Sequence, residues 1–436
     1  MMFLSLAVAG PNAHAVTPPP DGGYPGGNTA EGQAALLNLT SGGFNTAVGL
    51  FSLRSNTVGA FNTGIGAGTL LANTADGNTA TGAGALLSNT AGTYNTAGGA
   101  FALFSNTTGG GNTANGGRAL VNNTIGAYNT ANGAFALENN TTGSGNAANG
   151  AQALRENITG NNNTANGFLA LYHNTDDGNT ATGYGALSAN TTGQNNTANG
   201  IRALEINTTG GANTATGVFA LFHNTTGGQN TAIGGAALAN NISGFLNVAL
   251  GDNAGGNVTT ADGVICIGQG VAGENVGNTC YIGNIFGVTS SGGAGVFVNS
   301  AGKLGTGTSS RRFKDDIKPM DQTSEAILAL EPVTFRYKKE VDPEGRSHFG
   351  LVAEDVEKVN PDLVVRDKEG RPYSVRYDQV NAMLLNEFLK AHRKVQDLEA
   401  IVARQQTQIE VLASGLEKLS AQIEVSRPGS QVVQVP

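Results

Sequence analysis

The chain has 436 residues, a formal net charge of −8, 65 glycines and no tryptophan; only 6% of its residues are aromatic and 13% are charged. This composition argues against a large conventional core, and a mildly acidic chain without a basic stripe is a poor candidate for nucleic-acid binding. The amino-acid composition changes at residue 308: 60 of the 65 glycines precede residue 309, whereas 40 of the 56 charged residues lie from 309 onward. The sequence therefore predicts a glycine-rich array followed by a charged domain.

The N-terminal segment has features of an export signal. An apolar run at residues 1–9 is followed by Ala13-His14-Ala15, which resembles a signal-peptidase site. No basic residue precedes the run, which indicates a true start further upstream. We expect a signal peptide at residues 1–15, a Pro- and Gly-rich linker at 16–27, and an extracellular or cell-surface location. No later stretch of the sequence is long and apolar enough to span a bilayer.

A repeat begins at Asn28 and continues to Asn247, with the consensus Asn-Thr-Ala-x-Gly-x-x-Ala-Leu-x-x-Asn-Thr-Thr-Gly-x-x. Eleven of the thirteen intervals between leading asparagines are 17 residues and two are 16. Both short intervals lose a residue in a Gly/Asp turn, so the flanking strands should stay in register. Seventeen residues are too few for a helix pair and suit one coil of a β-solenoid or β-roll, which we expect at residues 28–250.

The repeat also predicts which residues face the core. The triplet Ala-x-Gly has a period of two, so Ala and Gly are expected inside and the variable residue outside. The ninth position is Leu in all thirteen copies, from Leu36 to Leu238, and Asn-Thr and Thr-Thr-Gly are expected at corners. One buried Leu contributes about 1.5–3 kcal/mol, whereas ordering each residue costs about 1–2 kcal/mol, so a lone coil cannot fold. Stacking of coils and association of several chains are therefore expected.

Other interpretations of the repeat have less support. Asn-x-Thr triplets match glycosylation sequons, but corner positions explain them without sugar. The nonapeptide of calcium-binding rolls is absent, so we expect no ion ladder and no metal site. His173 and His223 lie three coils apart, too far to chelate one metal, and are expected to be solvated. Stacked threonine rows could form an ice-binding face, although such rows are commoner as structural corners. The pattern is loosely similar to the β-roll heads of trimeric adhesins.

Residues 251–308 are predicted to be a less regular β-rich connector. The segments 264–268 and 280–284 look like degenerate coils and hold both cysteines of the chain, Cys266 and Cys280. Cysteines with apolar neighbours are more often buried thiols than disulfide partners. The sequence favours thiols here and leaves their redox state open.

The C-terminal part is predicted to contain a strand at Val333–Lys338, a hairpin of Leu363–Asp367 with Tyr373–Tyr377, and a long helix. Residues 384–424 carry an a/d seam with alternating spacings of four and three, typical of a coiled coil. A single helix packed on its own domain is the alternative, and residues 425–436 read as a tail. The seam residues are Leu384, Phe388, Ala391, Val395, Leu398, Val402, Gln405, Ile409, Leu412, Leu416, Leu419 and Ile423.

A candidate nucleophile and base lie at the boundary between the glycine-rich array and the charged domain. Ser309 needs a neutral amine close by, and Lys314 supplies one only if burial or a neighbouring cation favours its neutral form. Arg311 and Arg312 are suitable cationic neighbours. Taken alone, the pair is a weak signal, because serines beside basic residues usually belong to solvated linkers.

The segment 309–317, Ser-Ser-Arg-Arg-Phe-Lys-Asp-Asp-Ile, resembles the cleavage motif of the endosialidase-type intramolecular chaperone, a self-processing C-terminal domain of phage tail spikes and fibres. Further motifs of that family follow in order at 329–337, 348–356, 360–364 and 375–378, and the resemblance covers residues 309–425. It implies a small α+β auto-processing domain at 309–383 and a three-stranded coiled coil, hence a homotrimer.

The resemblance also implies a chemistry. Ser309 would be the nucleophile of a self-cleaving serine peptidase, Lys314 its base and Thr308–Ser309 the bond cut, in one chain or between protomers. No cofactor is implied. The candidate supporting residues are Arg311, Arg312, Asp316 and Glu354, of which Glu354 has no assigned chemical role.

The sequence thus predicts a mainly β fibre, extracellular or on a virion, whose C-terminal chaperone drives trimer assembly and then releases itself. Its partners would be copies of itself and, as a candidate, a host-cell surface glycan or receptor. One alternative is a structural adhesin that trimerises without cutting. Another is a glycan-degrading tail spike, which needs paired carboxylates. The array has only scattered ones: Asp76, Glu138, Glu156, Asp176, Asp177 and Glu205.

Overall fold

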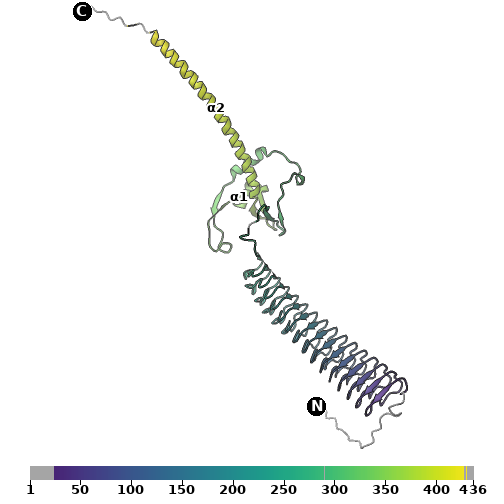
Figure 1. Cartoon of the computed structure of the whole chain (residues 1–436). Helices are drawn as coiled ribbons and strands as arrows, with labels where there is room; N and C mark the ends of the chain where they lie inside the picture. The colour runs from purple at the N-terminus through teal and green to yellow at the C-terminus, as the bar shows by residue number, and fades with distance from the viewer. Residues whose placement is uncertain (1–23, 289, 427–428, 430–436) are drawn as a thin grey trace, which may run out of the picture. The chain divides into compact units, whose positions relative to one another are not determined.

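The computed structural model describes residues 24–288, 290–426 and 429. The predicted signal peptide, most of the linker at 16–27 and most of the tail lie outside the described residues. The chain divides at residue 289 into two compact units. The first contains the repeat array, and the second contains the charged region and the long helix (Figure 1).

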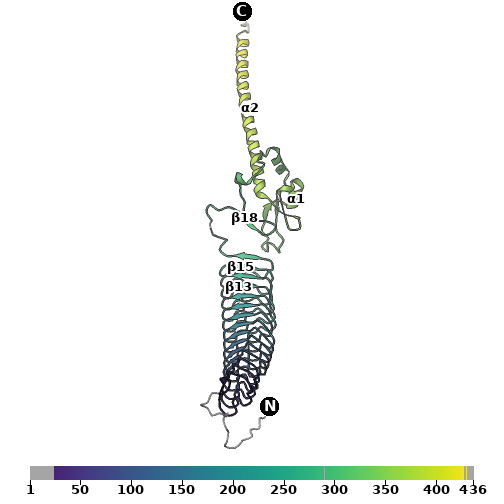
Figure 2. The same ribbon diagram turned by 90° about the vertical axis from the view of Figure 1, so that its right-hand side faces the viewer.

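The first unit is a β-solenoid, as the 17-residue period predicts. Each coil contributes one three-residue strand to a parallel sheet of 16 strands that follow one another in sequence order, seen edge to edge along the stack in Figure 2. Equivalent repeat positions pair directly, for example Ala131 with Ala148. The bounds are β1 Thr29–Glu31, β2 Thr46–Val48, β3 Thr63–Ile65, β4 Thr79–Thr81, β5 Thr96–Gly98, β6 Thr113–Asn115, β7 Thr130–Asn132, β8 Ala147–Asn149, β9 Thr164–Asn166, β10 Thr180–Thr182, β11 Thr197–Asn199, β12 Thr214–Thr216, β13 Thr231–Ile233, β14 Val248–Leu250, β15 Ile265–Ile267 and β16 Cys280–Ile282.

The two 16-residue coils keep the strands in register, as expected. Thr63 pairs with Thr79 and Thr164 with Thr180, so the missing residue is absorbed in the corner. The degenerate coils also continue the same sheet, because β15 pairs with β14 and β16 with β15. Cys266 is buried, Cys280 is exposed, and both are free thiols. Burial raises the pKa of the Cys266 thiol above its ordinary value.

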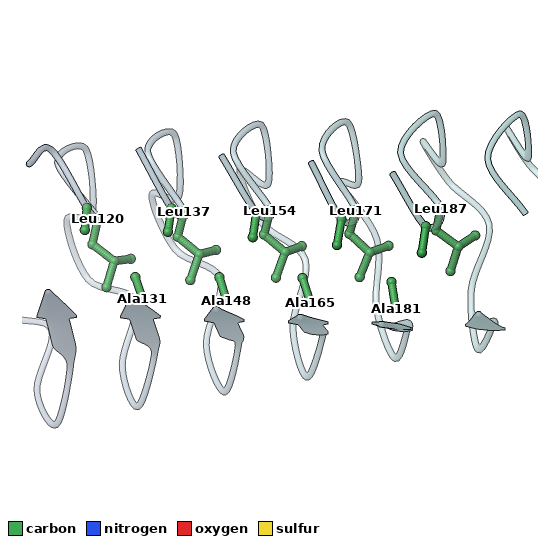
Figure 3. Packing of buried hydrophobic residues seen from close by; sticks show 14 of the residues in the cluster. Leu120, Ala131, Leu137, Ala148, Leu154, Ala165, Leu171, Ala181 and Leu187 are labelled. Carbon is green, nitrogen blue, oxygen red and sulfur yellow. The ribbon is translucent and has the colours of Figure 1, made fainter. Parts of the chain in front are cut away.

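The core contains the residues that the repeat predicts, apart from the fifth-position glycine. The central residue of the strands is a buried Ala in most coils, with Gly64 in its place in β3 and Cys266 in β15. A second Ala in most coils and the ninth-position Leu are buried as well, and Figure 3 shows Leu137 and its neighbours pointing toward the strand alanines. These leucines have φ between 48° and 54°, a left-handed conformation that is uncommon for a large side chain. The turn lets neighbouring N–H groups bond along the stack: Phe135 donates to Gly117 of the preceding coil, and Leu137 to Ala153 of the next.

The fifth-position glycine is not a core residue, so that part of the prediction is wrong. These glycines have φ between 117° and 144° and lie where the strand turns into the next side of the coil. A Cβ at Gly133 would lie 2.6 Å from the carbonyl carbon of Gly150 in the next coil. Glycine is required by the backbone angle and by this close approach, not by inward packing.

Two rows of buried asparagines explain why Asn recurs at the corners of the repeat. In the first row, Asn129 donates from Nδ2 to Oδ1 of Asn112, 3.2 Å away, and to the carbonyl oxygen of Gly143. In the second row, Asn123 donates to Oδ1 of Asn106 at 2.7 Å. Burial of these amides, including the sequon asparagine Asn106, accounts for the Asn-x-Thr pattern without sugar.

The second unit is a small α+β region that ends in a long helix. Its core contains Val356, Leu363, Val364, Val375 and Met383. The predicted hairpin is confirmed, and the predicted strand at 333–338 is shorter than expected. The elements are β17 Val296–Val298 paired with β18 Leu304–Thr306, η1 Arg311–Phe313, η2 Asp321–Ala329, β19 Val333–Phe335 paired with β20 His348–Gly350, α1 Ala353–Val359, η3 Pro361–Leu363, β21 Val364–Arg366 paired with β22 Pro372–Val375, and α2 Tyr377–Val425.

Candidate functional site

The structure brings the predicted nucleophile and base together within one chain. Five residues of strand would separate Ser309 and Lys314 by about 16 Å, and five residues of helix would place them about 140° apart around the axis. Neither applies, because the one-turn 3₁₀ helix η1 reverses the chain between them. Lys314 Nζ lies 3.1 Å from Ser309 Oγ and donates a hydrogen bond to it. This distance suits proton transfer between the two groups.

The surroundings of the pair are open. Ser309 and Lys314 are both exposed, as are the residues of η1 between them. The Arg312 guanidinium lies 4.6 Å from the centroid of the Phe313 ring, a cation–π contact within the same turn. In a single chain the pair therefore lacks the burial that would favour a neutral lysine.

The predicted supporting residues do not join the pair. Arg311 and Arg312 lie in η1, Asp316 follows it with φ of 53°, and Glu354 lies in the first turn of α1. The backbone N–H of Lys314 donates to the carbonyl oxygen of Arg311 at 3.1 Å. Among the described residues, no side-chain hydrogen bond or ion pair links any of the four to Ser309 or Lys314. The structure thus brings Ser309 and Lys314 together, but the side chains of the four predicted supporting residues do not contact the pair through a hydrogen bond or an ion pair.

The helix α2 leaves its predicted seam uncovered. It has 49 residues, and among those described Met383 is the one that is buried. The apolar seam residues are between 50% and 73% exposed: Leu384, Phe388, Val395, Leu398, Val402, Ile409, Leu412, Leu416, Leu419 and Ile423. The seam is not used for packing on the helix's own domain, which was the alternative to a coiled coil.

Besides Met383, a polar cluster and not the apolar seam attaches α2 to its own domain. The buried hydroxyl of Ser324 in η2 hydrogen-bonds to Glu387, accepts from Asn386 Nδ2 at 2.7 Å, and lies 3.5 Å from Lys390 Nζ. Lys390 also pairs with Glu387 at 2.7 Å. Hydrogen bonds from Lys390 and Ser324 lower the pKa of Glu387 below its ordinary value. The i, i+3 spacing of Glu387 and Lys390 is visible in the sequence, but nothing there marks Ser324 as their partner.

Most of the carboxylates that the sequence offered in the array form ion pairs or accept hydrogen bonds from backbone N–H groups. Glu138 is buried between Arg118 and Arg155, at 2.9 and 2.6 Å, and Glu156 pairs with the exposed His173 at 2.7 Å. Glu205 pairs with Arg202. Asp76 and Asp177 accept backbone N–H groups of the preceding coil, and Asp176 accepts from Gln194. This arrangement contains no evident acid–nucleophile pair for glycoside hydrolysis.

The described residues show neither a membrane-crossing helix nor a metal-binding group. None of the helices that the structure describes is both long and apolar enough to cross a bilayer. In the same part of the chain, no three His, Cys, Asp or Glu side chains gather as a metal site would require.

Comparison with known proteins identifies one part of the chain. Neither the curated proteins nor the solved structures give a match. A family model described as chaperone of endosialidase matches residues 309–365, starting at the serine that contacts Lys314. A β-solenoid followed by such a segment fits a tail-fibre-like protein with a chaperone domain. The segment 309–365 thus matches the chaperone-of-endosialidase family, as the resemblance of its motifs predicted.

Proposed function

We propose that the protein is a homotrimeric fibre, extracellular or carried on a virion, whose C-terminal domain aligns three chains and then cuts itself off. The observation that carries this proposal is the uncovered seam of α2. Ten large apolar side chains in heptad spacing remain half exposed or more, although the helix already packs on its domain through Met383 and the Ser324 cluster. Exposed a/d seams of this length are stabilised by partner helices.

Trimerisation would serve the rod as well as the helix. The core of the solenoid contains little beyond alanine and one leucine per coil, and three separate chains would have to find one common register. Such pairing is slow and exposes strand edges during folding. A clamp that holds the three C-termini together would keep the chains aligned while their coils stack.

The proposed reaction begins with Ser309 Oγ attacking the carbonyl carbon of Thr308. Lys314, in its neutral form, takes the hydroxyl proton and passes it to the Ser309 nitrogen as the Thr308–Ser309 C–N bond breaks, so that an ester forms and the Ser309 amino group is released. Water then hydrolyses the ester, leaving the Thr308 carboxylate and the free Ser309 hydroxyl. The 3.1 Å contact supports this assignment of roles. Because the pair is exposed in one chain, packing of the protomers would supply the burial that a neutral lysine needs.

The test combines intact mass with sedimentation equilibrium on the full chain. We expect the parent protein to split after residue 308, and Ser309→Ala and Lys314→Ala to remain full-length trimers. Ser310→Ala is the matched control and should still be cut. Full-length parent protein would contradict self-cleavage and favour the adhesin that trimerises without cutting, and monomeric Ser309→Ala would contradict the trimer.

A further inference from the structure

One corner of the solenoid carries aromatic rings that are unusually exposed. Four repeats have an aromatic residue directly before the leading asparagine, and these rings form a row that we call the aromatic edge. Phe44 and Phe61 are 65% and 64% exposed, and Tyr94 and Tyr128 are 74% and 78% exposed. Several rings elsewhere on the array are covered by cations, such as Phe135 between Arg118 and Arg155.

Glycines at the same repeat position hold these rings in place. Aromatic residue and glycine alternate from Phe61 through Gly77, Tyr94, Gly111 and Tyr128. A Cβ added at Gly77 would lie 2.8 Å from the Tyr94 ring, and one at Gly111 would lie 2.9 Å from the Tyr128 ring. Each tyrosine ring therefore packs directly on the backbone of the preceding coil. Because the ring orientation is set before any ligand arrives, little conformational entropy is lost on binding.

The spacing and charge of the edge indicate its ligand. Tyr94 and Tyr128 lie two coils apart, about 9.6 Å at the usual strand separation. Among the seven corner segments from 40–44 to 141–145, Asp76 is the one acidic or basic residue, and it accepts the backbone N–H of Ala60 at 2.8 Å. An uncharged row of regularly spaced rings complements an uncharged polymer with apolar ring faces.

We propose that the aromatic edge binds an extended neutral polysaccharide, with sugar rings stacked on Tyr94 and Tyr128. The inference extends the proposed fibre function by naming a surface and a class of ligand. Between Phe61 and Tyr128, a polysaccharide chain lying along the rod would meet a ring at every second coil. Sugar hydroxyls would meet the threonines and backbone groups of the corner segments between the rings.

The test is electrophoresis of the full chain in native gels that contain a soluble polysaccharide. The probes are neutral glucans, mannans and galactans, including hydroxyethylcellulose, with carboxymethylcellulose as the acidic counterpart. We expect at least one neutral probe to retard the parent protein, and Tyr94→Ala with Tyr128→Ala to weaken that affinity about tenfold or more. Tyr184→Ala is the matched control, because Tyr184 is also exposed but occupies a different repeat position, stacked on Phe168.

Three results would overturn the inference: no retardation by any neutral probe, equal retardation of the double variant and the parent, or stronger binding to the acidic probe. Sedimentation velocity tests the rival occupant, since a smaller oligomer in the double variant would assign the edge to a second copy of the chain. Circular dichroism and protease resistance show whether the double variant still folds. Cleavage after residue 308 is scored in the same preparations, so failure of the binding proposal is distinguishable from failure of the fibre proposal.

Discussion

Replacing Leu137 with Asp tests whether one leucine per coil holds the array together. Leu137 is fully buried among the same leucines and alanines of the adjacent coils. The substitution loses about 1.5–3 kcal/mol of burial. Keeping an aspartate neutral at pH 7 costs about 4 kcal/mol more, from the distance between that pH and its ordinary pKa. The expected loss is therefore about 6 kcal/mol at one coil.

The backbone conformation at residue 137 favours Asp over Leu, so strain cannot account for a loss of stability in this variant. Leu137 has φ of 51°, and Asp tolerates this left-handed conformation better than Leu does. A loss of stability can thus be assigned to burial and not to strain. Because each coil contacts only its neighbours, the array should open at this coil while distant coils remain stacked.

Limited proteolysis with mass analysis is the assay, together with thermal unfolding. We expect Leu137→Asp to be cut near residue 137 and the domain after residue 309 to stay folded. Ile125→Asp is the matched control, because Ile125 is 55% exposed in a neighbouring coil. Equal protease resistance and equal melting of the two variants would refute the assignment of the ninth position to the core.

Three further predictions concern the corner, the polar cluster and the seam. In the 16-residue coil that begins at Asn163, Asn174 Nδ2 donates to the carbonyl oxygen of Asp176 and not to Asn157 Oδ1, which is buried and has no hydrogen-bond partner among the described residues. Inserting Gly after Asp177 should stabilise the array by about 1–3 kcal/mol in denaturant unfolding, whereas the same insertion after Gly210, in a 17-residue coil, should destabilise it. Because the pKa of Glu387 is lowered, the stabilisation that its carboxylate gives the folded domain is fully present above the ordinary glutamate pKa and is lost as the pH falls through the lowered one. Glu387→Gln should therefore be less stable at neutral pH and should lose this part of the acid dependence in melting curves. An unchanged pH profile would contradict the cluster's role. Leu398→Asp with Leu412→Asp should block both trimer formation and cutting after residue 308 on a denaturing gel, and efficient cutting in that variant would separate cleavage from assembly.

The sequence alone determined the regular parts of this protein. A period of 17 residues, shortened to 16 in two coils, with Leu at one position leaves a single register for the coils, because any slip would move the leucine out of the core. The alternation of three and four residues on α2 likewise fixes which of its faces is apolar, because side-chain direction in a helix follows from its pitch. Both properties are local and repeat many times, so the signal accumulates along the chain.

The tertiary structure decided what depends on a single turn or on residues far apart in the sequence. Ser309 meets Lys314 only because one 3₁₀ turn reverses the chain, and five residues of sequence do not specify such a turn. The role of the fifth-position glycine depends on the carbonyl group of the next coil, which the period-two pattern does not show. Besides Lys390, Glu387 bonds to Ser324, 63 residues earlier, and only the packing of η2 on α2 brings Ser324 and Glu387 together.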